Sequence, residues 1–175
     1  MALVFLRHTT PDVAEGVCYG MTDLALRPTF KAECAVVLRD LPRVERIISS
    51  PLSRCYRLAA ALGEALALTV SIDERLREMD FGRWEGQRWD QINRGDLDLW
   101  AEDFMHARPH GGESVYQLQS RVRSAMGSYG ELPGDSLLVT HAGVIKAAFA
   151  KAEHSEAFEG TTPFGGMRRW PEAYG

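Results

Sequence analysis

Three short apolar runs along the chain end abruptly in polar residues. They span Ala2–Leu6, Val44–Ser49 and Ser136–Thr140. An apolar run of this length is typical of a strand that is buried on both faces of a parallel sheet. The polar residues that follow each run are therefore predicted to lie at the carboxyl end of a strand.

Amphipathic or alanine-rich segments separate these runs and predict helices. The predicted helices are Thr29–Leu41, Leu52–Leu66, Trp89–Phe104, Ser114–Tyr129 and a segment from Ala142 through Ala150. Two further short strands are predicted at Thr69–Ile72 and Phe164–Trp170. Strands that alternate with helices indicate an α/β fold. We expect a three-layer α/β/α sandwich around a mostly parallel central sheet.

The chain is expected to form a single domain over residues 1–175. Its length and its 45% hydrophobic composition suffice for one substantial core but not for two. A middle segment, about residues 80–129, is expected to be a helical excursion from that domain over the active site. The segment after Ala150 is interpreted either as a final strand or as a flap on the substrate side.

Composition and charge exclude several classes of protein. No run approaches the roughly 18 apolar residues of a membrane span, and the first residues lack a secretory signal pattern, so we expect a cytoplasmic protein without membrane partners. The formal net charge of -4 argues against nucleic-acid binding. The three cysteines, Cys18, Cys34 and Cys55, are far apart, so reduced thiols are expected. No pattern in the sequence indicates an oligomeric state.

Histidine and arginine side chains follow the predicted strands at separate places in the chain. Arg7 and His8 follow the first run, a Ser-Ser pair ends the second, and His141 follows the third. Arg54 lies at the start of the helix after the second run. In open parallel sheets, ligands bind beyond the carboxyl ends of the strands. The sequence therefore predicts that these side chains meet at one site.

Together these residues supply the groups that hydrolysis of a phosphate monoester requires. Enzymes accelerate this reaction by up to about 10^21, so a nucleophile, cations and a proton donor are all needed. His8 is the candidate nucleophile, because a neutral imidazole nitrogen attacks phosphorus and water can hydrolyse the product. Arg7 and Arg54 present forks that match phosphate oxygens, and His141 adds a donor. Glu78 is the candidate proton donor to the departing oxygen.

Taken singly, each of these residues has an ordinary structural explanation. An Arg-His pair after a strand is usually a surface pair or a satisfied core pair. Arg54 would be a solvated residue of a helix, and His141 would cap a helix. Glu78 follows a charged segment and would be an exposed loop residue. Their convergence at the strand ends favours the catalytic interpretation.

Four motifs, in this order, carry a family resemblance. They are Leu6–Pro11, Ser49–Arg54, Glu78–Gly86 and Val139–Gly143. From its first strand to about Ala150, the chain resembles the histidine phosphatase superfamily, which is also called the phosphoglycerate mutase-like family.

The resemblance implies a role for each matching residue. His8 would be phosphorylated, and Glu78 would be the acid. Arg7, Arg54 and His141 would bind the phosphoryl group. The family usually has glycine directly after the nucleophile, whereas this chain has threonine there. The approach of that backbone to phosphate is therefore expected to differ in detail.

A further signature narrows the resemblance. The segments His8–Pro11 and Gly16–Leu24 resemble the alpha-ribazole phosphatase branch, which removes the 5'-phosphate of a ribazole in cobalamin assembly. This resemblance implies a small-molecule phosphate ester as the partner. A flat benzimidazole favours an aromatic wall, so we expect Trp84 or Tyr19 to contact the leaving group. The expected substrate-binding residues are Thr9, Tyr19, Gly20, Thr22, Trp84 and Ala142.

Several alternative functions are compatible with the sequence. A broad-specificity or phosphoprotein phosphatase fits the same motifs. A phosphoglycerate mutase fits less well, because it needs insertions that shield the phosphohistidine from water. A silent phosphate-binding scaffold is the alternative outside enzymes.

No cofactor and no metal ion is expected, and activity should persist in the presence of EDTA. The histidines do not form a ligand cluster by their spacing. His106 and His110 are close in sequence, but Pro109 and Gly111 interrupt any helix that would pair them.

Overall fold

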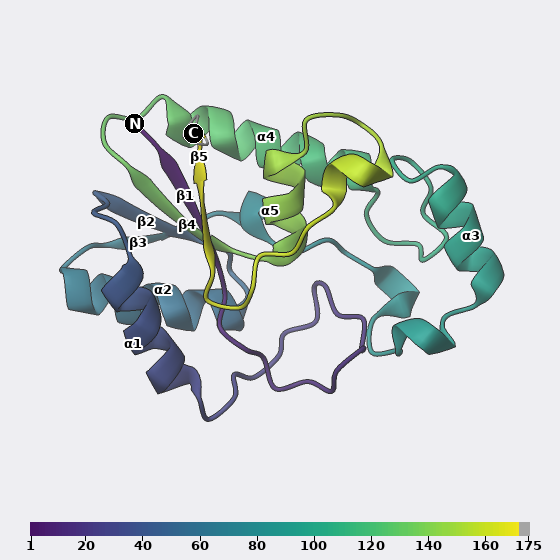
Figure 1. The fold of residues 1–175 in the computed structure, drawn as a ribbon, viewed down its shortest axis with the longest axis horizontal. Coiled ribbons are helices and arrows are strands. Elements are labelled where there is room, and N and C mark those ends of the chain that lie inside the picture. Colours follow the sequence, from purple (N-terminus) through teal and green to yellow (C-terminus); the bar gives the residue numbers. More distant parts are fainter. Residues whose placement is uncertain (172–175) are drawn as a thin grey trace.

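A five-stranded sheet forms the centre of the molecule in the computed structural model, which describes residues 1–171 (Figure 1). The strands are β1 (Leu3–Arg7), β2 (Arg46–Ser49), β3 (Val70–Ile72), β4 (Ser136–Thr140) and β5 (Met167–Trp170). They lie in the order β3-β2-β4-β1-β5. All neighbours are parallel except β5, which pairs antiparallel with β1. The expected mostly parallel sheet is confirmed.

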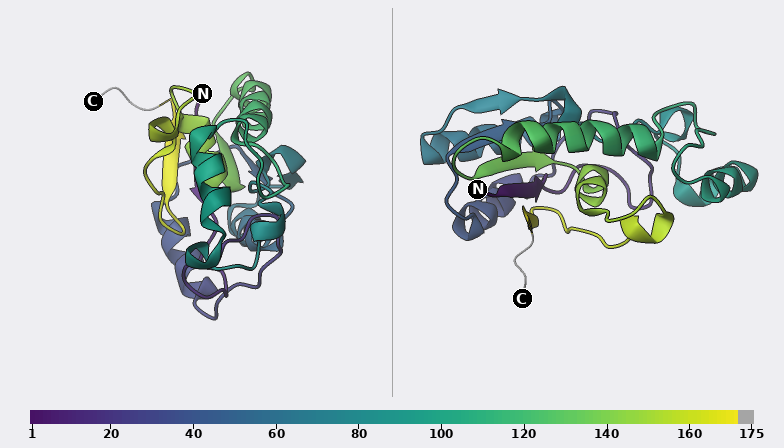
Figure 2. Two further views of the ribbon diagram at one scale, coloured as in Figure 1. Left: turned by 90° about the vertical axis from the view of Figure 1, so that its right-hand side faces the viewer. Right: turned by 90° about the horizontal axis from the view of Figure 1, so that it is seen from above.

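Helices cover both faces of this sheet and complete three layers (Figures 1 and 2). The helices are α1 (Phe30–Asp40), α2 (Ser53–Leu66), α3 (Arg94–Glu102), α4 (Val115–Gly130) and α5 (Ala142–Phe149). In Figure 1, α4 and α5 lie above the sheet, α1 and α2 lie below it, and α3 lies apart at the right. The α/β/α sandwich is therefore confirmed. Within residues 1–171, no helix is long and apolar enough to cross a membrane.

The alternation of side chains along the central strands separates two apolar cores. On β1, Leu3 and Phe5 pack with α4 and α5, whereas Val4 and Leu6 pack with α1 and α2. Successive Cβ atoms of a strand point to opposite faces of the sheet. A strand that is covered on both faces is therefore apolar at every position, which explains the continuous apolar runs.

The helix predicted over Trp89–Phe104 is broken in the structure. Trp89–Gln91 form a 3₁₀ turn, and α3 begins only at Arg94. The side chain of Asn93 accepts a hydrogen bond from the backbone N–H of Asp96. This local bond favours a helix start over a helix interior. The prediction of one continuous helix was therefore wrong at this point.

The excursion is shorter than expected, because α4 belongs to the sandwich. Ser114 and Gln117 form a capping box at the start of α4. The apolar side of this helix then packs in the core above the sheet. The residues that leave the layers are about 80–113, and they comprise α3 with 3₁₀ turns at Gly82–Trp84 and Trp89–Gln91.

The segment after α5 forms a loop and then a final strand. A 3₁₀ turn at Ser155–Phe158 is followed by a return to the end of β1. The strand predicted over Phe164–Trp170 begins only at Met167, because a turn occupies its first residues. In that turn the N–H of Gly166 donates to the carbonyl of Pro163.

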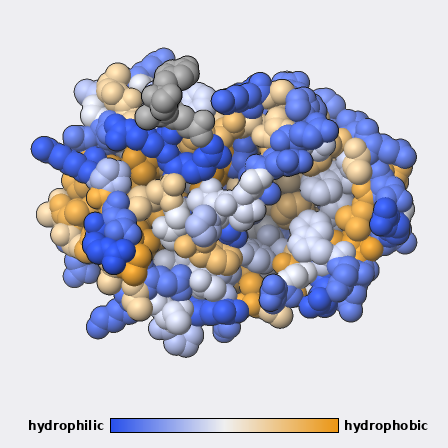
Figure 3. Space-filling view, viewed as in Figure 1, coloured by the Kyte–Doolittle hydropathy of each residue, from blue (hydrophilic) through white to orange (hydrophobic). Residues whose placement is uncertain are grey.

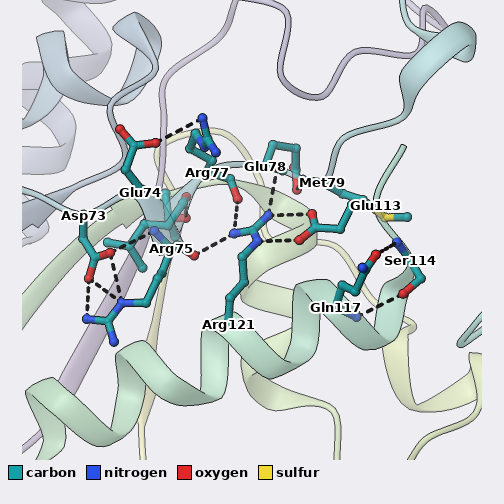
Figure 4. A network of polar contacts seen from close by, with 12 residues as sticks. Asp73, Glu74, Arg75, Arg77, Glu78, Met79, Glu113, Ser114, Gln117 and Arg121 are labelled. Atoms are coloured by element: carbon teal, nitrogen blue, oxygen red, sulfur yellow. Dashed lines mark hydrogen bonds and ion pairs between the residues drawn. The ribbon is translucent and has the colours of Figure 1, made fainter. Parts of the chain in front are cut away.

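Arg121 of α4 anchors the chain that leaves β3 (Figure 4). Its guanidinium donates to the backbone carbonyls of Arg75, Arg77 and Glu78 at 2.6, 2.7 and 3.0 Å. It also donates to both carboxylate oxygens of Glu113 at 2.6 and 2.8 Å. These bonds use all of the N–H groups of the side chain. The backbone that carries Glu78 is thereby fixed to α4.

Arg121→Lys is expected to lower the free energy of unfolding by about 2–3 kcal/mol, because an ammonium cannot reproduce the fork and leaves several acceptors unpaired. Urea titration followed by circular dichroism measures the change. Arg123→Lys, which lies on the exposed side of the same helix, is the matched control. It should change the free energy of unfolding by less than about 0.5 kcal/mol. Equal effects of the two substitutions would contradict the anchoring role.

Candidate active site

The carboxyl ends of three neighbouring strands meet at one edge of the sheet. β1, β4 and β2 are adjacent, so the residues that follow them come together as predicted. The N–H of His8 donates to the carbonyl of Thr140 at 3.0 Å, and the N–H of Ser50 donates to the carbonyl of Val139 at 2.9 Å. The backbone register therefore places His8, Ser50 and His141 close together.

His8 and His141 face each other at this edge, with ring centroids 5.2 Å apart. Nδ1 of His8 lies 2.7 Å from the carbonyl oxygen of Thr9. A carbonyl oxygen only accepts, so Nδ1 carries the proton and Nε2 keeps its lone pair. Burial, together with the nearness of Arg54 and Arg7, lowers the pKa of His8 to about 3. The ring is therefore neutral at physiological pH.

His141 is held by residues from the end of β2 and the start of α2. Its Nε2 lies 2.8 Å from the hydroxyl of Ser50 and 3.4 Å from the thiol of Cys55. Burial, with the nearness of His8 and Arg54, holds the pKa of His141 well below its usual range. A bound phosphate dianion opposes those cationic influences and favours the donor form of the ring. Sequence analysis placed Ser50 at the site as part of the Ser-Ser pair but gave it no chemical role, and it did not single out Cys55, which directly follows the second motif.

Arg54 is completely buried in the first turn of α2. Its two terminal nitrogens donate to the carbonyls of Thr22 at 2.7 Å and Gly20 at 2.6 Å. These bonds fix the orientation of the guanidinium. Its Nε–H has no acceptor within residues 1–171. A buried donor without an acceptor costs about 1–3 kcal/mol.

Arg7 is oriented by the segment that precedes β5. One terminal nitrogen donates to the carbonyl of Thr162 at 2.7 Å, and the guanidinium carbon lies 3.8 Å from the centre of the Phe164 ring. Like that of Arg54, its buried Nε–H has no acceptor in the part of the chain that the structure describes. Two guanidinium cations beside two neutral imidazoles form a site of positive potential that suits a dianion.

Glu78 reaches the same edge from the segment after β3. It is only 8% exposed, and its carboxylate accepts hydrogen bonds from the N–H groups of Met79 at 2.9 Å and Gly143 at 3.1 Å. A Cβ atom at position 143 would lie 2.3 Å from one carboxylate oxygen. The glycine of the fourth motif is therefore required by this close approach. Gly143 follows His141 closely in α5, so the carboxyl group lies beside the histidine pair.

Four of the residues that were expected to bind substrate surround Arg54 and the first histidine. The carbonyl of Thr9 accepts a hydrogen bond from the ring of His8. The carbonyls of Gly20 and Thr22 accept hydrogen bonds from the guanidinium of Arg54. The ring centre of Tyr19 lies 5.4 Å from the guanidinium carbon of Arg54. Three of the four thus orient the candidate catalytic side chains of His8 and Arg54, and direct contact of the four residues with substrate stays a prediction.

The other two expected substrate-binding residues lie in different surroundings. Ala142 begins α5 and lines a cavity beside Glu78. Trp84 is 1% exposed and packs with Cys18 and Ile92, so the structure does not bring its side chain to this cavity. The aromatic residues that line the cavity are Phe81, Trp89, Trp100, Phe104 and Phe158.

Glu85 is a positioning residue that sequence analysis did not single out. Its carboxylate accepts hydrogen bonds from the N–H groups of Met21 at 2.9 Å, Thr22 at 2.8 Å and Phe81 at 3.1 Å, and from the Thr22 hydroxyl. Burial acts to raise its pKa, but these hydrogen bonds outweigh burial and lower the pKa overall. Glu85 therefore holds the loop whose carbonyls orient Arg54. The only feature of the sequence that pointed to Glu85 was its place in the third motif.

The buried, neutral state of His8 makes stability depend on pH. Its pKa of about 3 in the folded protein lies below the ordinary value of 6.5, so the unfolded chain binds the proton first as pH falls. The contribution of His8 to stability is complete above pH 6.5 and is lost as pH falls toward 3. The limiting slope is about 1.4 kcal/mol per pH unit.

We expect His8→Gln to flatten this pH dependence of the free energy of unfolding between about pH 4 and pH 6. Urea titrations at several pH values measure the slope for both proteins. His106→Gln, at an exposed position, is the matched control and should leave the slope as it is in the wild type. A slope that is the same with and without the His8 imidazole would contradict its buried, neutral state.

Known proteins resemble this chain in sequence and in fold. The family model of the histidine phosphatase superfamily (branch 1) matches residues 3–162. A glucosyl-3-phosphoglycerate phosphatase from Mycobacterium tuberculosis is 34% identical over 164 residues, which cover 85% of this chain and 73% of that protein. The native structure of mycobacterial glucosyl-3-phosphoglycerate phosphatase has a TM-score of 0.84 at 28% identity, over 96% of this chain and 88% of that chain.

An Escherichia coli protein assigned as an alpha-ribazole-5'-P phosphatase has a TM-score of 0.81 at 22% identity, over 97% of this chain and 89% of that chain. At this level of identity the likeness concerns the fold and leaves the branch of the family open. The family match, in contrast, spans the histidine pair, both arginines and Glu78. The chain therefore belongs to the histidine phosphatase superfamily, branch 1.

Proposed function

We propose that the chain hydrolyses phosphate monoesters of small molecules through a phosphohistidine on His8. The observation that carries this proposal is the convergence of the Arg7 and Arg54 guanidinium groups on two neutral imidazoles whose ring centroids lie 5.2 Å apart. A phosphoryl dianion supplies acceptors for these guanidinium groups and balances both charges. The family match and the phosphatase from M. tuberculosis support the same activity.

In the first step, Nε2 of His8 attacks phosphorus in line with the leaving oxygen. An N–P bond forms as the P–O bond breaks, and Nδ1 stays protonated because it donates to the carbonyl of Thr9. The two arginines and His141 hold the equatorial oxygens as charge is redistributed. Glu78, protonated at this moment, transfers its proton to the leaving oxygen.

In the second step, water releases the phosphoryl group. Glu78, now a carboxylate, removes a proton from the water whose oxygen attacks phosphorus. The N–P bond breaks, its electron pair returns to Nε2 of His8, and inorganic phosphate leaves. The carboxyl group serves both steps from one position, which its two backbone hydrogen bonds define.

We also propose that no metal ion takes part in these steps. Arg7 and Arg54 supply the positive charge that divalent cations supply at other phosphoryl-transfer sites, and His141 adds a hydrogen-bond donor. Full activity is therefore expected in assays that contain EDTA throughout.

Two esters are the leading candidates for the substrate. The signature around His8–Pro11 favours alpha-ribazole 5'-phosphate, as in cobalamin assembly, and the aromatic cavity beside Glu78 offers a wall for its benzimidazole ring. The relative from M. tuberculosis favours glucosyl-3-phosphoglycerate. A panel that contains both esters, scored by release of inorganic phosphate, separates them. Transfer of the phosphoryl group without release would instead indicate a mutase.

Glu78→Gln is expected to lower kcat/KM by about 10²-fold for an alkyl phosphate but by less than about 10-fold for para-nitrophenyl phosphate. The reason is that an alkoxide needs a proton in order to leave, whereas nitrophenolate leaves without one. Steady-state assays on both esters, with EDTA in the buffer, measure this difference.

Two further variants serve as controls for this experiment. His8→Ala should lower kcat/KM for both esters by at least about 10³-fold. The variant should still unfold cooperatively, which shows that it is folded. Glu74→Gln, which changes an exposed carboxylate nearby, should keep both rates within about 2-fold of the wild type. An equal loss on both esters for Glu78→Gln, or turnover by His8→Ala, would count against the mechanism.

A further inference from the structure

A cavity of about 420 Å³ opens beside Glu78, between the start of α5 and the excursion. In Figure 3 the surface is hollowed right of centre, where pale and orange residues lie within a rim of blue. Glu78 lies at this cavity and protonates the leaving oxygen in the proposed mechanism, so the alcohol that departs from phosphorus is expected to occupy this space.

Aromatic side chains form much of the cavity wall and hold one another in place. Phe81 contacts Trp89 with ring centroids 5.5 Å apart, and Phe104 contacts both Trp100 and Phe158 at 5.4 Å. Rings that interlock in this way form a preformed apolar surface. The leaving group is therefore expected to present an apolar face to this wall.

Lys146 is the one cationic residue of this wall within residues 1–171. It follows Ala142 by about one turn of α5, so both residues lie on the same face of the helix. Helical side chains lean toward the helix N-terminus, which here is the end that carries His141 and the contact with Glu78. In the described part of the chain, the Lys146 side chain has no hydrogen bond and no ion pair.

An unpaired ammonium on an apolar wall indicates an anion on the ligand. Lys146 is half-buried, so a neutral leaving group that filled the cavity would displace water from its ammonium without replacing those hydrogen bonds. One lysine matches the single charge of a carboxylate, whereas the phosphoryl dianion already faces Arg7 and Arg54.

We infer that Lys146 binds a carboxylate of the leaving group, so that the substrate is the phosphate ester of a hydroxy acid with an apolar part. This inference rests on the proposed hydrolysis at His8. A ribazole leaving group carries no carboxylate and would leave Lys146 unpaired, so the inference favours an acidic ester over alpha-ribazole phosphate.

The test compares kcat/KM for phenyl phosphate with kcat/KM for its meta- and para-carboxyphenyl analogues. These esters share the aromatic ring and differ by the carboxylate. The wild type is expected to favour at least one carboxylated ester by about 3- to 10-fold, as one partly screened ion pair allows. This first comparison needs no variant.

Substitutions at position 146 then assign the preference to its charge. Lys146→Met keeps the approximate length of the side chain but removes its charge. It should bring the ratio of kcat/KM for the preferred carboxyphenyl phosphate to kcat/KM for phenyl phosphate close to one. Lys146→Arg should retain the preference. Lys151→Met changes an exposed lysine that does not line the cavity, and as the matched control it should also retain the preference.

The experiment distinguishes a failure of the role of Lys146 from a failure of the proposed hydrolysis. A ratio near one in the wild type, or a preference that survives Lys146→Met, overturns the role of Lys146, while turnover of phenyl phosphate still supports the proposed function. Absence of phosphate release from all three esters overturns the proposed function and the inference with it.

Discussion

The neutrality of His8 is the condition on which the rest of the site depends. Burial and two neighbouring guanidinium groups lower the pKa of this imidazole to about 3. In the proposed mechanism, the arginines that bind phosphate therefore also keep the lone pair of His8 free of a proton. The hydrogen bond from Nδ1 to the carbonyl of Thr9 leaves Nε2 as the ring nitrogen with a free lone pair, which the proposed attack requires. One arrangement of charge thus serves both binding and nucleophilicity.

Backbone groups position most of this arrangement. The parallel pairing of β1, β4 and β2 sets His8 beside His141, and three loop carbonyls orient the two arginines. Glu85 and Arg121 do not belong to the histidine and arginine cluster but support it. Glu85 accepts hydrogen bonds from the loop at residues 20–22, and Arg121 donates hydrogen bonds to the segment at residues 75–78. Both bind main-chain groups, so they fix the backbone that carries or orients the candidate catalytic side chains.

The sheet and the histidine pair could be predicted because local patterns specify them. Apolar runs that are buried on both faces identify the strands, and polar residues directly after them identify the edge. Local patterns failed where a helix start, the burial of a side chain or its orientation was less evident from neighbouring residues or depended on contacts with residues distant in sequence. Amphipathic spacing continues across Asn93 and conceals the helix start there. The burial of Trp84 depends on Cys18, and the orientation of Arg7 depends on Thr162, so neither could be seen in a short window of sequence.

Phosphorylation of Nε2 of His8 is the step on which the proposed mechanism depends most directly. Mixing the enzyme with a radiolabelled phosphate ester and quenching rapidly in alkali traps the bond, since a phosphoramidate survives alkali and is hydrolysed by acid. We predict label on a single peptide that contains His8, lost on acidification and formed at least as fast as turnover. Turnover without labelled protein, or acid-stable label on another residue, would contradict the mechanism.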